Sequence, residues 1–427
     1  MDYNQTMEYI RELNQKKGMV FGLSTMKSLL DALGVRRDFD AVHVAGTNGK
    51  GSLCNFTAEI LMRASYKVGI YTSPAVGDDL EIIRINKKNI TKTRFAKLFT
   101  RAVNVALEIG IFPTAYELQT AVAFMYFMEE ECDICVIECG LGGRLDATNV
   151  LTKPLITAFA SIGMDHMHIL GNTIADIARE KAGIIKNGAT AVCQQSDDKA
   201  IAVLESVCFD KKVDLIATED AQNIVTYDNK TVFSYRGYRD LIIRQPGLYQ
   251  VYNACEAVDI ARTLTTYGYN ITLENIYDGL YKSKLKFRYE TISKSPRIIV
   301  DGAHNENAIK RLMENVSRDF KDKKLIYVCG MFKDKDYKEA MRILTTHSSA
   351  KEYITITPPG SRGLKSSELA KVIKDMDKDA LVNDSENVHC AVEYILQKAS
   401  KDDIILAFGS LSYLKEFSMC VRDYYRI

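Results

Sequence analysis

The chain has 427 residues, a length that predicts two or three domains at roughly 150 residues each. With 47% hydrophobic and 26% charged residues it is an ordinary globular chain, and its net charge of +1 argues against a broad nucleic-acid-binding face. No apolar run approaches the length of a membrane span. The ten cysteines are scattered, and the CxxC at Cys132–Cys135 lacks further ligands at zinc-site spacing. We therefore predict reduced thiols, no membrane association and a cytoplasmic protein.

Strands and helices alternate through the first two thirds of the chain. Helices are predicted over residues 2–16, 25–33, 93–109, 115–130, 174–182, 251–267 and 273–280. Strands are predicted from Val42 and over residues 67–71, 134–137, 155–159, 189–193 and 213–217, and residues 75–89 are predicted to be a loop with an extended part around 82–85. Residues 223–243 alternate apolar and polar side chains, with turn residues at Asp228-Asn229 and Arg236-Gly237, so a small antiparallel sheet is predicted there.

A basic, polar stretch without periodicity covers residues 282–295, and Pro296 precedes a new strand. Beyond it strands and helices alternate regularly, which predicts a second doubly wound α/β domain with right-handed crossovers. The predicted division is a first domain over 1–285, a linker over 286–295 and a second domain over 296–427.

The central motif is AVHVAGTNGKGS, residues 41–52. A buried strand, a glycine turn, a lysine, a hydroxyl and a helix follow one another, which is the layout of a phosphate-binding loop. Lys50 is the expected point charge for the terminal phosphates, and Ser52 is the nearest hydroxyl for a magnesium ion. The match is imperfect, because Val44 replaces the usual first glycine and Gly51 separates Lys50 from Ser52. A glycine-rich turn with an exposed lysine is the alternative.

Further polar groups follow predicted strands. Glu138 ends the strand 134–137 before a second glycine loop, and His166 follows the strand 155–159. In open α/β sheets ligands bind at the carboxyl ends of strands, so both residues are metal-site candidates. Asp301 and His304 take the same position in the second domain. From the residues alone, Lys181 is a solvated helix lysine and Arg288 a solvated linker residue.

Taken in order, several motifs resemble the folylpolyglutamate synthase/dihydrofolate synthase family of Mur ligases. They are HVAGTNGKGS, YTSP at 71–74, ECGLGGRLDATNV at 138–150, MDHMHILG at 164–171, REKAGIIK at 179–186, QVYNA at 250–254, FRYE at 287–290 and DGAHNENA at 301–308. The series covers nearly the whole chain. It implies a Mur-ligase-like P-loop domain with a mostly parallel sheet, followed by a smaller Rossmann-like glutamate-ligase domain.

The family reaction is ATP-dependent amide formation, in which a carboxylate takes the γ-phosphoryl group of ATP and the amine of L-glutamate then displaces phosphate. The resemblance implies ATP and Mg²⁺ as cofactors, a folate and L-glutamate as substrates, and a monomer. It also implies the site residues. The ATP-binding residues would be Thr47, Asn48, Gly49, Lys50, Gly51, Ser52, Asn253, Arg288 and Asp301; the metal ligands Ser73, Glu138 and His166; and the catalytic residues Lys50, Lys181 and His304. Lys181 matches the lysine that is carbamylated in the family.

The chain departs from the family pattern where substrate recognition is expected. Ala75 follows TSP where family members usually have histidine, and Leu80-Glu81-Ile82 keeps only the acid of an Asn-Glu-Arg run. Tyr249 replaces a histidine that often precedes Gln250. A folate-extending ligase is therefore the first hypothesis. A bifunctional dihydrofolate synthase, a Mur-type ligase for another carboxylate, and an ATP-binding protein that has lost catalysis are the alternatives.

Overall fold

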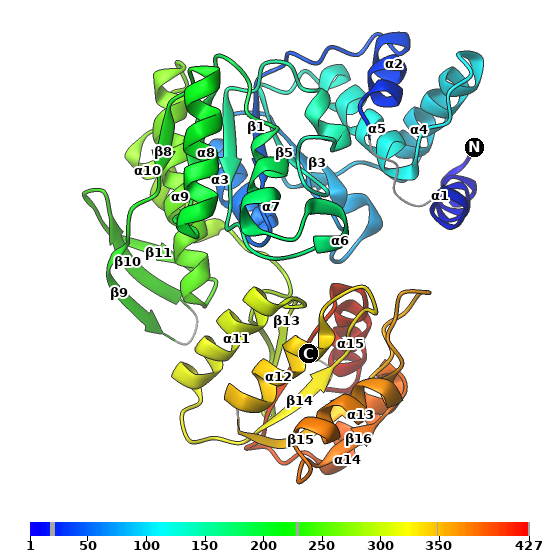
Figure 1. Ribbon diagram of the computed structural model, residues 1–427, viewed down its shortest axis with the longest axis vertical. Coiled ribbons are helices and arrows are strands. Elements are labelled where there is room, and N and C mark those ends of the chain that lie inside the picture. The colour runs from blue at the N-terminus through cyan, green and yellow to red at the C-terminus, as the bar shows by residue number, and fades with distance from the viewer. Residues whose placement is uncertain (18–21, 228–229, 348, 426–427) are drawn as a thin grey trace. The chain divides into compact units, whose positions relative to one another are not determined.

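The computed structural model describes residues 1–17, 22–227, 230–347 and 349–425 (Figure 1). The chain divides into two compact units. Unit 1 comprises Met1–Val225, Val232–Arg244 and Gln250–Ser283, and unit 2 comprises Thr226–Thr231, Gln245–Tyr249 and Lys284–Ile427. Each unit contains a mostly parallel sheet, so the predicted α/β class is confirmed.

Unit 1 is built on an eight-stranded sheet with the order β4-β3-β2-β5-β1-β6-β7-β8. Its strands are β1 (Ala41–Ala45), β2 (Val68–Tyr71), β3 (Ile83–Ile85), β4 (Lys88–Asn89), β5 (Ile134–Glu138), β6 (Ile156–Phe159), β7 (Thr190–Cys193) and β8 (Leu215–Ala217). All neighbours pair in parallel except β2 with β3 and β3 with β4. The carboxyl end of β1 therefore lies between those of β5 and β6, and the polar loops after these three strands meet at one edge.

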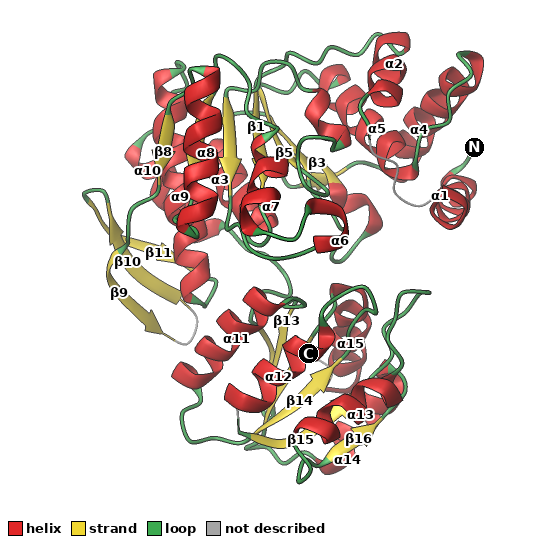
Figure 2. Ribbon diagram, in the orientation of Figure 1, coloured by secondary structure: helices red, strands yellow, loops and turns green. Residues whose placement is uncertain are grey.

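The helices of unit 1 are α1 (Tyr3–Lys17), α2 (Ser24–Ala32), α3 (Lys50–Arg63), η1 (Asp79–Ile82), α4 (Lys92–Glu108), α5 (Ala115–Glu129), η2 (Ala147–Val150), α6 (Met167–Leu170), α7 (Ile174–Ala182), α8 (Asp198–Lys211), α9 (Leu248–Thr266) and α10 (Leu273–Lys282). Figure 2 shows helices flanking the strands. Successive residues of a strand point to opposite faces of its sheet. Val42 and Val44 accordingly pack with residues of α3, α9 and α10, whereas Ala45 packs with residues of α7 and α8.

The predicted small antiparallel sheet is present. It consists of β9 (Gln222–Tyr227), β10 (Lys230–Tyr235) and β11 (Tyr238–Ile243) in the order β11-β10-β9. The predicted turn at Arg236-Gly237 joins β10 to β11, and both of its residues have positive φ (44° and 86°), as a two-residue hairpin turn of right-handed twist requires. The other predicted turn, Asp228-Asn229, lies outside the described residues.

Unit 2 has a six-stranded sheet with the order β12-β13-β17-β14-β15-β16. The strands are β12 (Glu290–Lys294), β13 (Arg297–Asp301), β14 (Leu325–Cys329), β15 (Ala350–Thr355), β16 (Val382–Asp384) and β17 (Ile404–Phe408). The helices are α11 (Glu306–Asp319), α12 (Tyr337–His347), α13 (Ser366–Met376), α14 (Val388–Lys398) and α15 (Leu411–Tyr425). Only β12 is antiparallel to its neighbour.

Strand β12 lies inside residues 286–295, which the sequence predicts to be a linker. The prediction of an irregular segment is therefore wrong for Glu290–Lys294, which pairs along Arg297–Val300 of β13. An edge strand has one partner and keeps polar side chains in water, so it shows no continuous apolar run.

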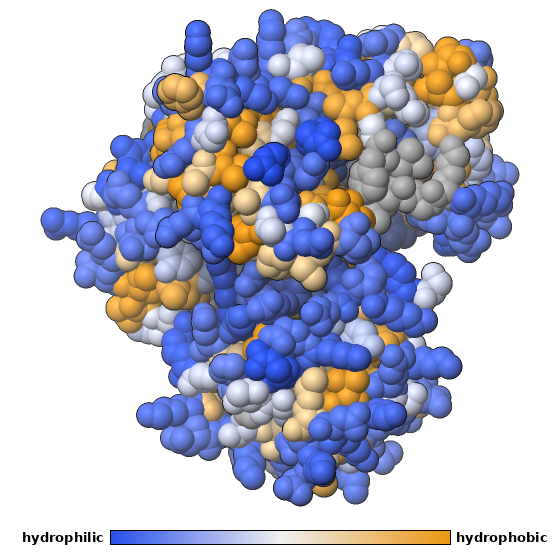
Figure 3. Space-filling model, in the orientation of Figure 1, coloured by the Kyte–Doolittle hydropathy of each residue, from blue (hydrophilic) through white to orange (hydrophobic). Residues whose placement is uncertain are grey.

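The surface is predominantly hydrophilic on the face shown in Figure 3, with apolar residues in separate patches. Exposed large apolar side chains such as Phe209, Phe112 and Leu381 come from different segments of the chain. No described helix combines the length and the apolar character needed to cross a bilayer.

Candidate active site

The loop between β1 and α3 has a backbone that only glycine adopts easily. Gly46 has φ +151° and Gly49 has φ +91°. A Cβ atom on Gly46 would lie 3.0 Å from the Cβ of Ala160, and one on Gly49 would lie 2.5 Å from Oδ1 of Asn253. Helix α3 begins directly after the loop, at Lys50. The loop therefore has the close packing and the helix N-terminus of an anion-binding turn.

The segment after β6 fixes the first part of this loop. The backbone N–H of Thr47 donates to the carbonyl of Ser161 over 2.8 Å. The Thr47 hydroxyl donates to the carbonyl of Gly163 (2.9 Å) and accepts from its N–H (3.0 Å). The N–H of Asn48 also donates to the Ser161 carbonyl, over 3.3 Å. Thr47 and Asn48, both predicted to bind ATP, are thus held by a neighbouring strand end.

Two lysines point at this loop. The ammonium of Lys50 donates to the carbonyl of Gly46 (3.1 Å) and to that of Thr47 (3.4 Å). Lys181, from α7, donates to the same Gly46 carbonyl over 2.9 Å and is only 3% exposed. The expectation of a solvated Lys181 is therefore wrong. Burial and the charge of Lys50 lower the pKa of Lys181 from 10.5 to about 7, so near neutrality much of this side chain is an uncharged amine.

The predicted metal ligands Ser73, Glu138 and His166 follow or end β2, β5 and β6, which with β1 form the centre of the sheet. The carboxylate of Glu138, which ends β5 and is buried, accepts from the backbone N–H of Ser73 over 3.2 Å. Its Oε2 atom lies 3.7 Å from where a Cβ of Gly51 would stand. His166 follows the segment that holds Thr47 and takes a left-handed backbone conformation at the start of α6, with its Nε2 3.9 Å from an oxygen of Asp165.

These groups fit a magnesium ion that takes most of its oxygen ligands from phosphates and water. Among the described residues, no cluster of three or more His, Cys, Asp or Glu side chains forms a metal site by itself. Mg²⁺ is commonly held by one or two carboxylates together with substrate phosphates, and Glu138 beside the loop is such a carboxylate.

Unit 2 carries a second polar cluster at the carboxyl end of β13. The buried carboxylate of Asp301 accepts from the N–H groups of Ala303 (2.8 Å) and Tyr289 (2.7 Å) and from the Tyr249 hydroxyl (3.3 Å). Burial raises its pKa, and the charge of Arg288 opposes that rise. The guanidinium of Arg288 packs against Gly302, because a Cβ atom on Gly302 would lie 2.7 Å from Nη1 of Arg288.

His304 lies two residues beyond Gly302 and bonds its carbonyl through Nδ1 over 2.8 Å. A carbonyl only accepts, so Nδ1 carries the proton and, in the neutral ring, Nε2 carries the lone pair. Arg288, Asp301 and His304 therefore belong to one cluster, in which the imidazole tautomer is fixed by the backbone.

Two family models together match most of the chain. The Mur ligase middle domain family matches residues 44–261, and the Mur ligase glutamate ligase domain family matches residues 287–411. Dihydrofolate synthase/folylpolyglutamate synthase of Bacillus subtilis is 33% identical over 417 residues, covering 94% of this chain and 95% of the relative. The chain belongs to this family of Mur ligases. Folylpolyglutamate synthase of Lacticaseibacillus casei is 31% identical over 386 residues, covering 85% of this chain and 87% of the relative.

Solved structures of family members have the same fold. E. coli FolC in complex with DHPP and ADP gives a TM-score of 0.87 at 26% identity, covering 99% of this chain and 98% of that one. An FPGS–AMPPCP–folate complex gives 0.84 at 27% identity and covers both chains completely. These family members bind nucleotides in a fold that the present chain shares from end to end.

Sequence reasoning missed a buried network beside the loop of this Mur ligase. His43, whose ring is fully buried, bonds the hydroxyl of Thr148 (2.8 Å) and contacts the thiol of Cys139 (3.1 Å). The Thr148 hydroxyl donates to Asp146, which also accepts from the Leu141 N–H. Burial lowers the pKa of His43 to about 3, so its ring is neutral. Asp146 and Thr148 belong to the family motif at 138–150, which was the available signal.

Gln194 was missed as well. It directly follows β7, and its amide donates to Oδ1 of Asn253 over 2.7 Å. A polar residue at a strand end was again the available signal.

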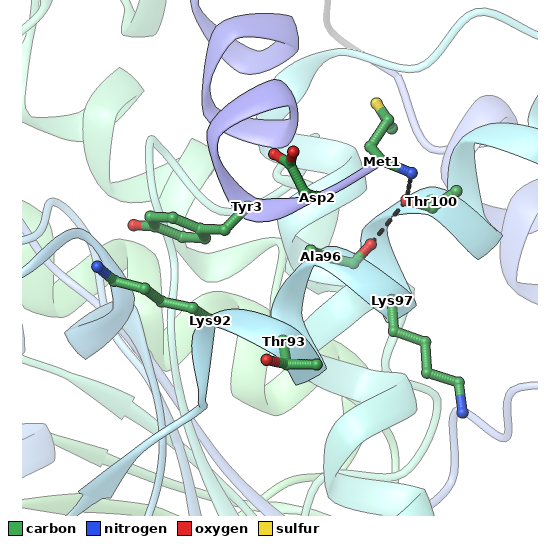
Figure 4. A pocket seen from close by; sticks show the side chains of 8 residues that line it. All are labelled: Met1, Asp2, Tyr3, Lys92, Thr93, Ala96, Lys97 and Thr100. Carbon is green, nitrogen blue, oxygen red and sulfur yellow. Dashed lines mark hydrogen bonds between the residues drawn. The ribbon is translucent and has the colours of Figure 1, made fainter.

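A separate hollow of about 430 Å³ lies between α1 and α4, where Met1, Asp2, Tyr3, Lys92, Thr93, Ala96, Lys97 and Thr100 line it (Figure 4). None of the predicted site residues lines it. The N-terminal ammonium donates to the Thr100 hydroxyl (3.0 Å), and the Lys92 ammonium lies 5.1 Å from the centre of the Tyr3 ring. The Met1 and Lys92 ammonium groups are thus each contacted by a side chain of the protein itself.

Proposed function

We propose that this protein is an ATP-dependent ligase that joins L-glutamate to the γ-carboxyl group of a folate. The observation that carries the proposal is the convergence of Lys50, Lys181, Glu138 and Asn253 on the Gly46–Ser52 loop, in a chain that matches folylpolyglutamate synthases along its length. In this reaction a carboxylate oxygen of the folate attacks the γ-phosphorus and ADP leaves. The glutamate amine then attacks the acyl carbon, phosphate leaves, and the amine loses its proton.

Phosphoryl transfer needs positioning and charge stabilisation more than covalent help from the protein. Lys50 and the helix N-terminus of α3 supply positive potential at the loop, where negative charge develops. Thr47, Asn48, Gly49, Gly51 and Ser52 form the cradle, and Asn253, Arg288 and Asp301 complete the proposed nucleotide contacts. Because its Nε2 holds the lone pair, His304 is the proposed acceptor of the proton that the glutamate ammonium loses.

Ser73, Glu138 and His166 are the proposed protein ligands of Mg²⁺, which would neutralise phosphate charge when bound. The proposal further includes L-glutamate as the amine donor, a monomer and a cytoplasmic location. All ten cysteines are free thiols, and a reducing compartment suits them.

The direct test incubates the protein with ATP, L-glutamate and a panel of reduced folates and dihydropteroate, and reads the products by mass. The expected result is a folate heavier by one glutamyl residue, with one ADP formed for each amide. Absence of ATP turnover and of amide with every acceptor would overturn the proposal. Dihydropteroate belongs in the panel because the B. subtilis relative carries both synthase names, which favours a bifunctional enzyme as the second candidate.

A further inference from the structure

Helix α9 carries a row of buried polar side chains. Gln250, Asn253 and Glu256 follow one another at three-residue steps, so they lie on one face of the helix. Their exposed fractions are 0%, 2% and 0%. Burying amide and carboxyl groups costs free energy unless they are hydrogen-bonded. The placement of this buried polar row therefore calls for a structural or functional explanation.

The amide of Asn253 is held at both of its ends. Gln194, 3% exposed at the end of β7, donates from Nε2 to Oδ1 of Asn253 over 2.7 Å. Asn253 in turn donates from Nδ2 to Oε1 of Gln250 over 3.1 Å. An asparagine amide has two N–H donors and an oxygen with two lone pairs. Gln194 therefore occupies one lone pair of the Asn253 oxygen, and Gln250 occupies one of its N–H donors. Together they fix the orientation of the Asn253 amide.

The fixed end touches the loop. Oδ1 of Asn253 lies 2.5 Å from where a Cβ of Gly49 would stand, so the amide packs directly on the backbone of the loop turn. A change in the Asn253 rotamer would press on Gly49 or leave a gap beneath it. The orientation of this amide and the shape of the loop are thus coupled by contact.

The third residue of the row, Glu256, is an acid whose ionisation is affected by its burial. Burial raises the pKa of Glu256 well above its usual value, with the charge of Asp259 adding to the rise and the Gln194 side chain opposing it. Burial therefore disfavours the ionised form of this carboxyl group.

We propose that Gln194 is a positioning residue for nucleotide binding, which acts by locking the amide of Asn253 against Gly49. This inference rests on the proposed nucleotide role of the loop, although it does not depend on which carboxylate the enzyme extends. Gln194 would act through Asn253 and not by contact with the nucleotide. With Gln194 and Gln250 bonded to it, the Asn253 amide keeps one N–H donor and one lone pair in fixed directions. The loop and the amide are therefore preorganised before the nucleotide binds.

The test measures ADP affinity by calorimetry in the whole protein, which separates it from any failure to ligate folates. Gln194→Leu removes the donor at nearly constant volume and should weaken ADP binding about tenfold or more, one lost hydrogen bond in a dry site. The KM for ATP should rise by a similar factor, with kcat changed much less. Gln245→Leu is the matched control. Gln245 is also 3% exposed, but neither of its amide atoms has a hydrogen-bond partner among the described residues.

A second variant distinguishes positioning from simple loss of packing. In Gln194→Glu a protonated carboxyl can still donate to Asn253, whereas an ionised one cannot. The ratio of variant to wild-type ADP dissociation constants should therefore rise between about pH 5 and pH 9, and the ratio for Gln194→Leu should stay flat. ADP affinity within twofold of wild type in Gln194→Leu, equal weakening in Gln245→Leu, or a flat ratio in Gln194→Glu would each overturn the proposal.

Discussion

Lys50 and Lys181 donate to the same atom, the backbone carbonyl oxygen of Gly46, over 3.1 and 2.9 Å. They arrive from different helices, α3 and α7. Lys181 is buried, and the ammonium of Lys50 that shares its acceptor repels it further, so the pKa of Lys181 falls to about 7. The charge of Lys181 therefore changes near neutral pH.

The first prediction concerns stability and pH. Between about pH 7, the folded pKa of Lys181, and its usual value of 10.5, the unfolded chain binds a proton that the folded chain has released. Lys181 therefore makes the free energy of unfolding rise with pH across that window. Below about pH 7 the full destabilisation caused by burying its charge is present. Lys181→Met lacks the effect, so the variant should gain on wild type below pH 7, by on the order of a few kcal/mol, and lose that advantage towards pH 10. Urea unfolding at several pH values in CO₂-free buffer measures it, and a difference that does not vary with pH would contradict it.

The second prediction concerns modification of the same residue. A neutral amine reacts with CO₂, and the nearby Lys50 would stabilise the resulting carbamate anion. Lys181→Glu, which keeps a negative group, should then retain more ligase activity than Lys181→Ala. Steady-state rates with and without added bicarbonate give the comparison, since only wild type should respond to bicarbonate. Equal activity in the two variants would remove the case for an anion at this position.

The third prediction concerns charge at the reaction centre. Lys50→Ala should abolish measurable ligation, because losing one preorganised positive charge at a developing anion costs roughly 3–4 kcal/mol of barrier, about a hundredfold to a thousandfold in kcat. Glu138→Ala should abolish it as well, because it removes a proposed carboxylate ligand of Mg²⁺. The far-ultraviolet circular dichroism spectrum should remain that of wild type. Near-normal turnover in Lys50→Ala would mean that this loop does not hold the phosphates.

The fourth prediction isolates the contact between the loop and α9. Gly49→Ala should abolish nucleotide binding, because its Cβ would stand 2.5 Å from Oδ1 of Asn253 at φ +91°. Gly51→Ala should cost much less, since its Cβ would meet only Glu138, at 3.7 Å. Gly34→Ala, at φ +67° with no atom within 4 Å, controls for backbone strain alone and should lose about 1 kcal/mol of stability with ADP affinity intact. Calorimetric titration with ADP checks all three, and weakening of equal size in Gly34→Ala would show that strain, not contact, is responsible.

The fifth prediction concerns the acceptor. Ala75 and Ile82 take the places of a histidine and an arginine in the family pattern, and Ile82 is buried in the apolar core that Ala75 also contacts. A site that loses polar partners for a pterin discriminates less well on that part of the substrate. We expect a higher kcat/KM for a reduced folate, which offers its glutamate as a further handle, than for dihydropteroate. Equal or better use of dihydropteroate, at saturating ATP and glutamate, would favour the bifunctional enzyme.

Much of this molecule could be predicted from local patterns. The strand, the glycine turn and the helix around Lys50 are consecutive residues, so their order alone predicts the loop. The strand-end positions of Glu138 and Asp301 are likewise predictable, because each follows an apolar strand run, and the carboxyl ends of parallel strands share an edge whatever the details of packing.

What the tertiary structure decided is which side chains meet. As a sequence, the helix around Lys181 is consistent with a solvated lysine, and only the packing of α7 beside the loop buries its amine and shifts its pKa. Gln194 and Asn253 are 59 residues apart, on a strand end and a helix, and no short-range pattern connects them. Strand β12 could not be predicted for a related reason: it pairs with β13 through backbone hydrogen bonds, and its residues form no apolar run that would indicate a strand. Residue type and spacing therefore determined the chemistry available at the loop, while burial and long-range contact determined the charge state and orientation of the groups around it.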